Sequence, residues 1–218
     1  MNTQNTVRDY FNRQATRFDA IYDADKPILQ RLVDRLRSVV VERFRLICNL
    51  APSAGPWTAL DVGSGSGRYC IAFARSGAAH VVGIDVAQAM TDFAAIEAQK
   101  AGVGQQCRFL TTGFLEYQAD RRYDVVVAMG YFDYLDDPLP HVSKMLALCQ
   151  GRIFLSFPKR WEIRVPIRKL RFALERGFVR FYSRRDVTRL MAEAGVPPDR
   201  WSLIDFDRDW IIAVRPLA

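Results

Sequence analysis

A glycine-rich stretch that follows a short apolar run constrains the fold of this chain more than any other feature. Residues 59–67 read ALDVGSGSG, so glycine stands at positions 63, 65 and 67. Glycine adopts positive φ without steric cost and lets the backbone approach a ligand closely. The residues that follow, 68–74, fit the start of a helix. The stretch therefore predicts a ligand-binding loop between a strand and a helix.

A second apolar run, 81–84, ends in Asp85. This acid follows Gly63 by about 20 positions, the separation at which α/β nucleotide sites place a carboxylate for ribose hydroxyls. The glycine spacing is GxGxG, one residue shorter than the GxGxxG of dinucleotide-binding sites. Asp61, which precedes the first glycine, is not part of that dinucleotide motif either. The pattern favours a nucleoside-type cofactor other than a dinucleotide.

The two segments LDVGSGSG and VVGIDVAQAM together resemble the first two motifs of class I S-adenosylmethionine (SAM)-dependent methyltransferases. The resemblance implies that the loop wraps the methionine part of SAM and that the acid after the second strand binds its ribose. Many relatives carry an acid for the adenine amino group where this chain has Gly113, so backbone groups are expected to contact adenine here. The residues assigned to the cofactor in this way are Asp61, Gly63, Ser64, Gly65, Gly67, Asp85, Val86, Met90, Gly113, Phe114 and Met129.

Strand and helix patterns alternate through the middle of the chain. Such alternation indicates βαβ units and a mostly parallel sheet. Two apolar runs near the end flank a short polar turn and predict an antiparallel hairpin, as in class I methyltransferases. The predicted strands are 58–62, 81–85, 107–111, 123–128, 152–156, 201–206 and 210–214, and the predicted helices lie near 66–76, 87–101, 138–149 and 183–194. We therefore expect an α/β, Rossmann-like, seven-stranded sheet with helices on both faces, a C-terminal β-hairpin and an N-terminal helical lid.

The length of 218 residues, half of them hydrophobic, fits one domain with a full core. We expect residues 1–218 to form a single methyltransferase domain. Within it, residues 1–50 would be the helical lid, 58–156 the SAM-binding core and 157–182 a basic insert on the substrate side.

Several classes of protein are disfavoured by composition. Every window of about 20 residues contains charge, which argues against a transmembrane helix, and the polar N-terminus does not resemble a signal peptide. The four cysteines are scattered without a CxxC pair, so we expect reduced thiols, no metal site and a cytoplasmic protein. A monomer or a homodimer is expected.

Positive charge is concentrated in residues 159–185, which carry ten Lys or Arg against two Glu, whereas the whole chain has a net charge of +7. Three interpretations stay open. The segment is a solvated amphipathic helix, a cap that binds a substrate carboxylate or phosphate through Arg164, Arg168 or Lys169, or a surface patch for anionic lipid. Nucleic acid is not expected as a partner, because the chain has no recognised binding module for it.

Candidate catalytic residues follow the strand at 123–128, where the family places the substrate beside the cofactor. Asp133 and Tyr134 could orient or deprotonate an acceptor, whereas Asp136 and Asp137 fit helix caps. His141, in the first turn of the next helix, is either a base or a solvated helix residue.

Tyr131 is assigned to the substrate pocket. Tyr10 and Tyr22 in the predicted lid could contact the sulfonium or the substrate, since aromatic faces attract cations, and core packing is the alternative.

The resemblance implies in-line methyl transfer from SAM to a small molecule. We expect an oxygen acceptor on a substrate that bears a carboxylate or a phosphate. The alternatives are a SAM-binding regulatory or scaffold protein without catalysis, and an NAD-dependent oxidoreductase.

Overall fold

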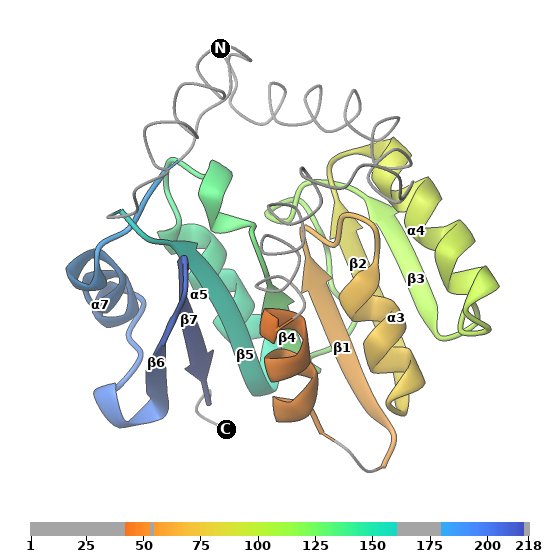
Figure 1. Cartoon of the computed structure of the whole chain (residues 1–218), viewed down its shortest axis with the longest axis horizontal. Helices are drawn as coiled ribbons and strands as arrows, with labels where there is room; N and C mark the ends of the chain where they lie inside the picture. Colours follow the sequence, from red (N-terminus) through yellow and green to blue (C-terminus); the bar gives the residue numbers. More distant parts are fainter. Residues whose placement is uncertain (1–41, 53–54, 161–179, 216–218) are drawn as a thin grey trace, which may run out of the picture.

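A computed structural model describes residues 42–52, 55–160 and 180–215 of the chain (Figure 1). Residues 42–50 are helical. The elements that follow are β1 (Trp57–Val62), α3 (Arg68–Arg75), β2 (Ala78–Asp85), α4 (Gln88–Lys100), β3 (Cys107–Thr111), β4 (Tyr123–Ala128), η1 (Phe132–Tyr134), α5 (Leu139–Leu148), β5 (Cys149–Pro158), α7 (Arg184–Glu193), η2 (Pro198–Arg200), β6 (Trp201–Phe206) and β7 (Asp209–Val214). The predicted alternation of strands and helices is confirmed.

The strands form one seven-stranded sheet in the order β3-β2-β1-β4-β5-β7-β6. β3, β2, β1, β4 and β5 run parallel, whereas β7 is antiparallel to both β5 and β6. This arrangement confirms the mostly parallel sheet and the C-terminal hairpin. Because the parallel strands all end at one edge, the loops after β1, β2, β3 and β4 meet there.

Helices cover both faces of the sheet (Figure 1), and each face has its own cluster of buried side chains. On one face, the helix at 42–50 and α3 bury Ile47 and Phe73 against alternate strand residues such as Val125. On the other face, α5 and α7 bury Met145 and Leu190. Side chains of successive strand residues point to opposite faces, so each buried strand serves both layers.

The starts of two strands lie three residues before the predicted positions, whereas the other element boundaries agree with the prediction to within two residues. β2 starts at Ala78, three residues earlier than expected, because Ala78 pairs with Trp57 at the start of β1. β5 starts at Cys149, because this residue pairs with Tyr123 of β4 and the preceding helix ends at Leu148. Backbone pairing with a neighbouring strand therefore determines where both strands start.

The ends of the predicted basic insert are brought together in the structure. Lys159 and Tyr182 form an isolated parallel bridge, and the N–H of Tyr182 donates to the carbonyl of Pro158 at 2.8 Å. Ser183 and Asp186 then form a capping box that starts α7. The chain therefore leaves and re-enters the described fold at one place, beside the carboxyl end of β5.

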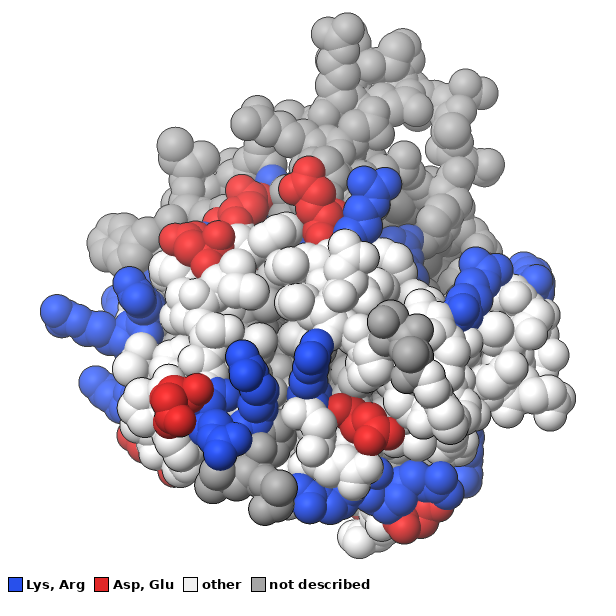
Figure 2. Space-filling model, turned by 90° about the horizontal axis from the view of Figure 1, so that it is seen from below, with Lys and Arg blue, Asp and Glu red and all other residues white. Residues whose placement is uncertain are grey.

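Basic and acidic side chains are interspersed on the face seen from below in Figure 2. Within the described ranges, no helix combines the length and the apolarity needed to span a bilayer. The same part of the chain holds no group of three or more His, Cys, Asp or Glu residues that could bind a metal ion.

Candidate functional site

A cavity of about 790 Å³ lies where the loops after β1, β2, β3 and β4 meet. Its volume is within the range of small-molecule sites. Residues of the helix at 42–50, the first turn of α3 and the start of α5 complete its wall. The cavity is therefore at the edge of the sheet where the sequence predicts ligand binding.

The glycine loop adopts the backbone conformation that its sequence predicts. Gly63, Gly65 and Gly67 have φ values of 73°, 50° and 74°. The N–H groups of Gly63 and Ser64 both donate to the carbonyl of Ile84, at 2.8 and 2.9 Å. A Cβ added to Gly63 would lie 2.8 Å from Cδ2 of Tyr131. The loop is thus tied to the end of β2 and packed directly against the segment that follows β4.

Gly67 differs from the two preceding glycines, because it is not among the described residues that line the cavity. It is the N-cap of α3, and a Cβ there would lie 2.9 Å from atoms of both Ala94 and Phe109. A Cβ on Gly83 would also lie 2.7 Å from the Phe109 ring. The structure thus gives Gly67 a packing position behind the loop.

Asp85 joins the end of β2 to the glycine loop. Its Oδ2 accepts a hydrogen bond from the N–H of Gly65, and its Oδ1 accepts one from the N–H of Ala87, both at 2.9 Å. Burial raises the pKa of Asp85, while the hydrogen bonds from backbone N–H groups act in the opposite direction. Asp85 lines the cavity together with Val86 and Met90.

Asp61 is a buried carboxyl group on the cavity wall, with 2% of the residue exposed. The Cys70 thiol donates to its Oδ2 at 3.5 Å. Burial raises the pKa of Asp61 to about 7. A cationic ligand group beside Asp61 would favour the ionised carboxylate.

The remaining predicted cofactor residues, Ser64, Gly113, Phe114 and Met129, also line the cavity. The Oγ of Ser64 is buried, and no hydrogen-bond partner for it lies within the described ranges.

Tyr131 and His141 form a hydrogen-bonded pair in the cavity, with 2.8 Å between the tyrosine hydroxyl and Nδ1. His141 is only 6% exposed, so the expectation of a solvated helix residue is wrong. Its ring stacks on Phe114 with centroids 6.1 Å apart. Burial lowers the pKa of His141 to about 4 and raises that of Tyr131. Both side chains are therefore neutral near pH 7.

The other two predicted catalytic residues, Asp133 and Tyr134, differ in whether they line the cavity. Tyr134 lines the cavity, whereas Asp133 is not among the described lining residues. Asp133 is 5% exposed, and its carbonyl accepts a hydrogen bond from the N–H of Arg180 at 2.8 Å. Oδ1 of Asp137 accepts from the N–H of Leu139, the first residue of α5, at 3.1 Å, although the N-cap of this helix is Pro138. The predicted substrate residues Tyr10, Tyr22, Arg164, Arg168 and Lys169 lie outside the described residues.

Arg43 is a lining residue that the sequence reasoning missed. Its Nη1 donates to Oδ2 of Asp209 at 2.5 Å, across 166 positions of sequence. A signal was available, because Arg43 and Ile47 are four residues apart on one face of a helix, and Ile47 is buried. A charged residue at the helical spacing of buried apolar residues lies on the buried face of the helix, so it is expected to pair with a specific polar group.

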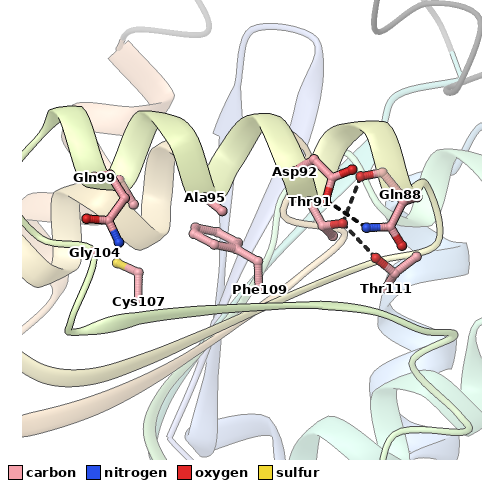
Figure 3. Close-up of a pocket in the computed structure, with 10 residues that line it drawn as sticks. Gln88, Thr91, Asp92, Ala95, Gln99, Gly104, Cys107, Phe109 and Thr111 are labelled. Atoms are coloured by element: carbon pink, nitrogen blue, oxygen red, sulfur yellow. Dashed lines mark hydrogen bonds between the residues drawn. The ribbon is translucent and has the colours of Figure 1, made fainter.

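A smaller cavity of about 170 Å³ lies between α4 and β3 (Figure 3). Its polar side chains bond to one another: Nε2 of Gln88 donates to Asp92 at 2.7 Å, and the hydroxyls of Thr91 and Thr111 are 2.6 Å apart. The Phe109 ring points from β3 toward α4 beside these groups (Figure 3). The larger cavity is therefore the candidate site.

Comparison with known proteins supports this assignment. A family model described as a methyltransferase domain matches residues 26–196. A ubiquinone biosynthesis O-methyltransferase of Aeromonas salmonicida (strain A449) is 33% identical over 99 residues, which are 44% of this chain and 41% of that protein. A tRNA U34 carboxymethyltransferase of Shewanella halifaxensis (strain HAW-EB4) is 37% identical over 89 residues, which are 40% of this chain and 27% of that protein. The chain thus matches less than half the length of these curated relatives.

The fold also matches a solved structure. The crystal structure of magnesium protoporphyrin IX methyltransferase from Synechocystis PCC 6803 with bound SAH superposes with a TM-score of 0.76. The match covers 99% of this chain and all of that one, at 22% sequence identity. Together with the family model, which spans most of the sequence, the fold leads to one assignment. This chain belongs to the class I SAM-dependent methyltransferases.

Proposed function

We propose that this protein transfers a methyl group from SAM to an oxygen atom of a small anionic molecule. One observation carries the proposal. The glycine loop and Asp85 line the same cavity as Tyr131, Tyr134 and His141. The relative named as an O-methyltransferase supports oxygen as the acceptor atom.

The residues present fit SAM. Gly65 leaves open space for a ligand against the backbone, because nothing lies within 4 Å of a Cβ there, whereas Gly63 lets the Tyr131 ring pack against the loop. Asp61 is placed to balance the positive charge of the methionine part, and Asp85 to accept hydrogen bonds from ribose hydroxyls. Gly113 and Phe114 would contact adenine through backbone groups. When bound, SAM supplies an activated methyl group, so the protein must position the acceptor and exclude water.

Tyr131 and His141 are proposed to orient the acceptor hydroxyl. Neutral His141 is a weak base, and its Nδ1 is engaged by the Tyr131 hydroxyl at 2.8 Å. With Tyr131 as the donor, its oxygen keeps lone pairs that can accept a hydrogen bond from the acceptor. Tyr134, on the same wall, offers a second hydroxyl. This arrangement supports alignment of the nucleophile as the main contribution of the protein.

The anionic character of the acceptor remains part of the proposal. Arg164, Arg168 and Lys169 are the predicted partners of its carboxylate or phosphate, and Tyr10 and Tyr22 the predicted aromatic contacts from the N-terminal segment. We further propose a cytoplasmic monomer or homodimer, for which sedimentation of the purified protein gives the oligomeric state.

The proposal is tested by incubating the purified protein with SAM and a panel of phenolic and carboxylic small molecules. Release of SAH together with a product that has gained one methyl group is the expected result. The Asp85→Ala variant serves as the control for SAH from other sources. Calorimetric titration with SAM and with NAD decides the cofactor, and binding of NAD alone would refute the proposal.

Two further measurements distinguish methylation of a small molecule from a regulatory role and from methylation of tRNA. SAM binding without methylation of any acceptor would support a regulatory protein. Incubation with SAM and unmodified tRNA tests methyl transfer to the kind of acceptor named for the Shewanella relative, and methylation of tRNA alone would overturn the small-molecule assignment.

A further inference from the structure

We propose that Lys144 is a positioning residue for the cofactor, because it holds the turn at 113–117 in place beside the cavity. The turn follows β3, and its first three residues, Gly113, Phe114 and Leu115, line the cavity. Lys144 belongs to α5 and is not among the described lining residues. The inference rests on the proposed function, which assigns adenine to this part of the wall.

The turn at 113–117 is closed by its own backbone at one end only. The carbonyl of Gly113 accepts hydrogen bonds from the N–H groups of Glu116 and Tyr117, both at 3.1 Å. The last carbonyls of a helical turn have no donor within the turn. The carbonyls of Leu115 and Tyr117 are in this position, so the carboxyl end of the turn needs a donor from another element.

Lys144 supplies that donor. Its Nζ donates to the carbonyl of Leu115 at 2.8 Å and to the carbonyl of Tyr117 at 2.6 Å, across 29 and 27 positions of sequence. Hydrogen bonds from a charged donor are stronger than neutral ones, and a positive charge is favourable beside the last carbonyls of a helical turn. Lys144 therefore fixes the carboxyl end of the turn, while the residues at the other end line the cavity.

The Phe114 ring is held by the same helix. Nζ of Lys144 lies 5.3 Å from the centroid of this ring, within the range of a cation–π contact. His141, one helical turn earlier on α5, stacks on the ring with centroids 6.1 Å apart. Phe114 is 2% exposed, so its ring has little freedom to move independently of the backbone. Two side chains of α5 thus set the position of the turn.

The contacts of Lys144 are separate from those that hold α5 on the sheet. The helix packs through Val142 and Met145, which are buried in the core. Replacing Lys144 should therefore leave the fold intact and loosen the turn at 113–117. The consequence should be found in binding of the adenosine part of the cofactor.

The test uses calorimetry on the full chain with SAH and with 5′-methylthioadenosine, which keeps the adenosine and the thioether and lacks the amino acid group. In Lys144→Met, both affinities should fall by the same factor, about tenfold, the effect of losing a charged hydrogen bond. Lys144→Arg can donate to both carbonyls and should restore most of the affinity. Lys100→Met is the matched control, because Lys100 is an exposed residue in the last turn of α4.

A double-mutant cycle distinguishes positioning from a general loss of stability. Phe114→Leu removes the ring that Lys144 faces, so Lys144→Met should weaken SAH binding less in that background than in wild type. The effect of Lys100→Met should be absent in both backgrounds. Equal effects of Lys144→Met in the two backgrounds, together with no rescue by Lys144→Arg, would overturn the inference.

Unchanged affinities in Lys144→Met would also overturn it, as would a loss for SAH that 5′-methylthioadenosine does not share. Thermal unfolding shows whether each variant is folded at the temperature of the titration. If Lys144→Met does not fold, Lys144→Gln keeps an amide donor and should show a smaller loss for both ligands. Failure of wild type to bind SAH would refute the proposed function, which is a separate outcome.

Discussion

Asp85 accepts a hydrogen bond from the backbone N–H of Gly65 at 2.9 Å, so the acid after β2 and the loop after β1 form one structural unit. Both oxygens of the carboxylate accept from backbone N–H groups, the second from Ala87. The carboxylate therefore fixes the loop as well as facing the cavity. A residue assigned to ribose also shapes the part of the site assigned to methionine.

Replacing Asp85 should weaken cofactor binding in two ways, because the ligand loses one contact and the glycine loop loses a hydrogen bond that holds it. In Asp85→Asn, an amide NH₂ would face the N–H of Gly65 or of Ala87, and one of these backbone donors would lose its partner. We expect SAH affinity to fall about 10- to 100-fold, the effect of removing a charged hydrogen bond. Calorimetry measures the change. Asp92→Asn on exposed α4 is the control, and equal affinities of the two variants would contradict the role of Asp85.

Gly63→Ala should impair both stability and SAH binding, because the new Cβ would lie 2.8 Å from the Tyr131 ring. Gly77 also has positive φ, but nothing lies within 4 Å of a Cβ there. Gly77→Ala therefore isolates backbone strain, about 1 kcal/mol. Chemical denaturation should show a larger loss for Gly63→Ala, and only that variant should lose SAH affinity. If Gly77→Ala is equally damaging, the contact with Tyr131 is not the cause.

Gly67 and Phe109 should be energetically coupled. A Cβ on Gly67 would lie 2.9 Å from ring atoms of Phe109, and Phe109→Leu would remove part of that conflict. We expect the double variant to be about 1 kcal/mol more stable than the sum of the single changes predicts. The pair Gly77→Ala with Phe109→Leu should be additive. Additivity in both pairs would show that the ring does not restrict Gly67.

Stability should depend on pH through His141. Its pKa is about 4 in the folded protein and about 6.5 when unfolded, so the unfolded chain binds more protons between these values. The contribution of His141 to the free energy of unfolding should therefore fall as the pH is lowered from about 6.5 to about 4, while Asp61, whose pKa is raised to about 7, contributes in the opposite direction. His141→Gln should remove the histidine contribution, so the difference in stability between wild type and this variant, measured by urea denaturation at several pH values, should shrink toward pH 4. The other histidine, His80, is less buried, so a wild-type slope in His141→Gln would contradict the burial argument.

The sequence alone determined the α/β sheet, the terminal hairpin and the glycine loop with Asp61 and Asp85. These features depend on local causes, namely hydrophobic periodicity, glycine conformation and the short turn between the last two strands. The predicted bounds of β3, β4 and β6 agree with the structure for the same reason. The starts of β2 and β5 differed most, by three residues each, where pairing with another strand extended them.

Tertiary structure alone decided which polar residues face the cavity. His141 is buried against Phe114, Asp133 is placed behind the wall, and Arg43 reaches the site through a bond to Asp209. Each of these outcomes depends on contacts between residues distant in sequence, which periodicity does not encode. The sequence therefore specified the cofactor loop, whose chemistry lies in consecutive residues. The acceptor side was decided by packing, because its residues come from separate elements that meet only in the folded chain.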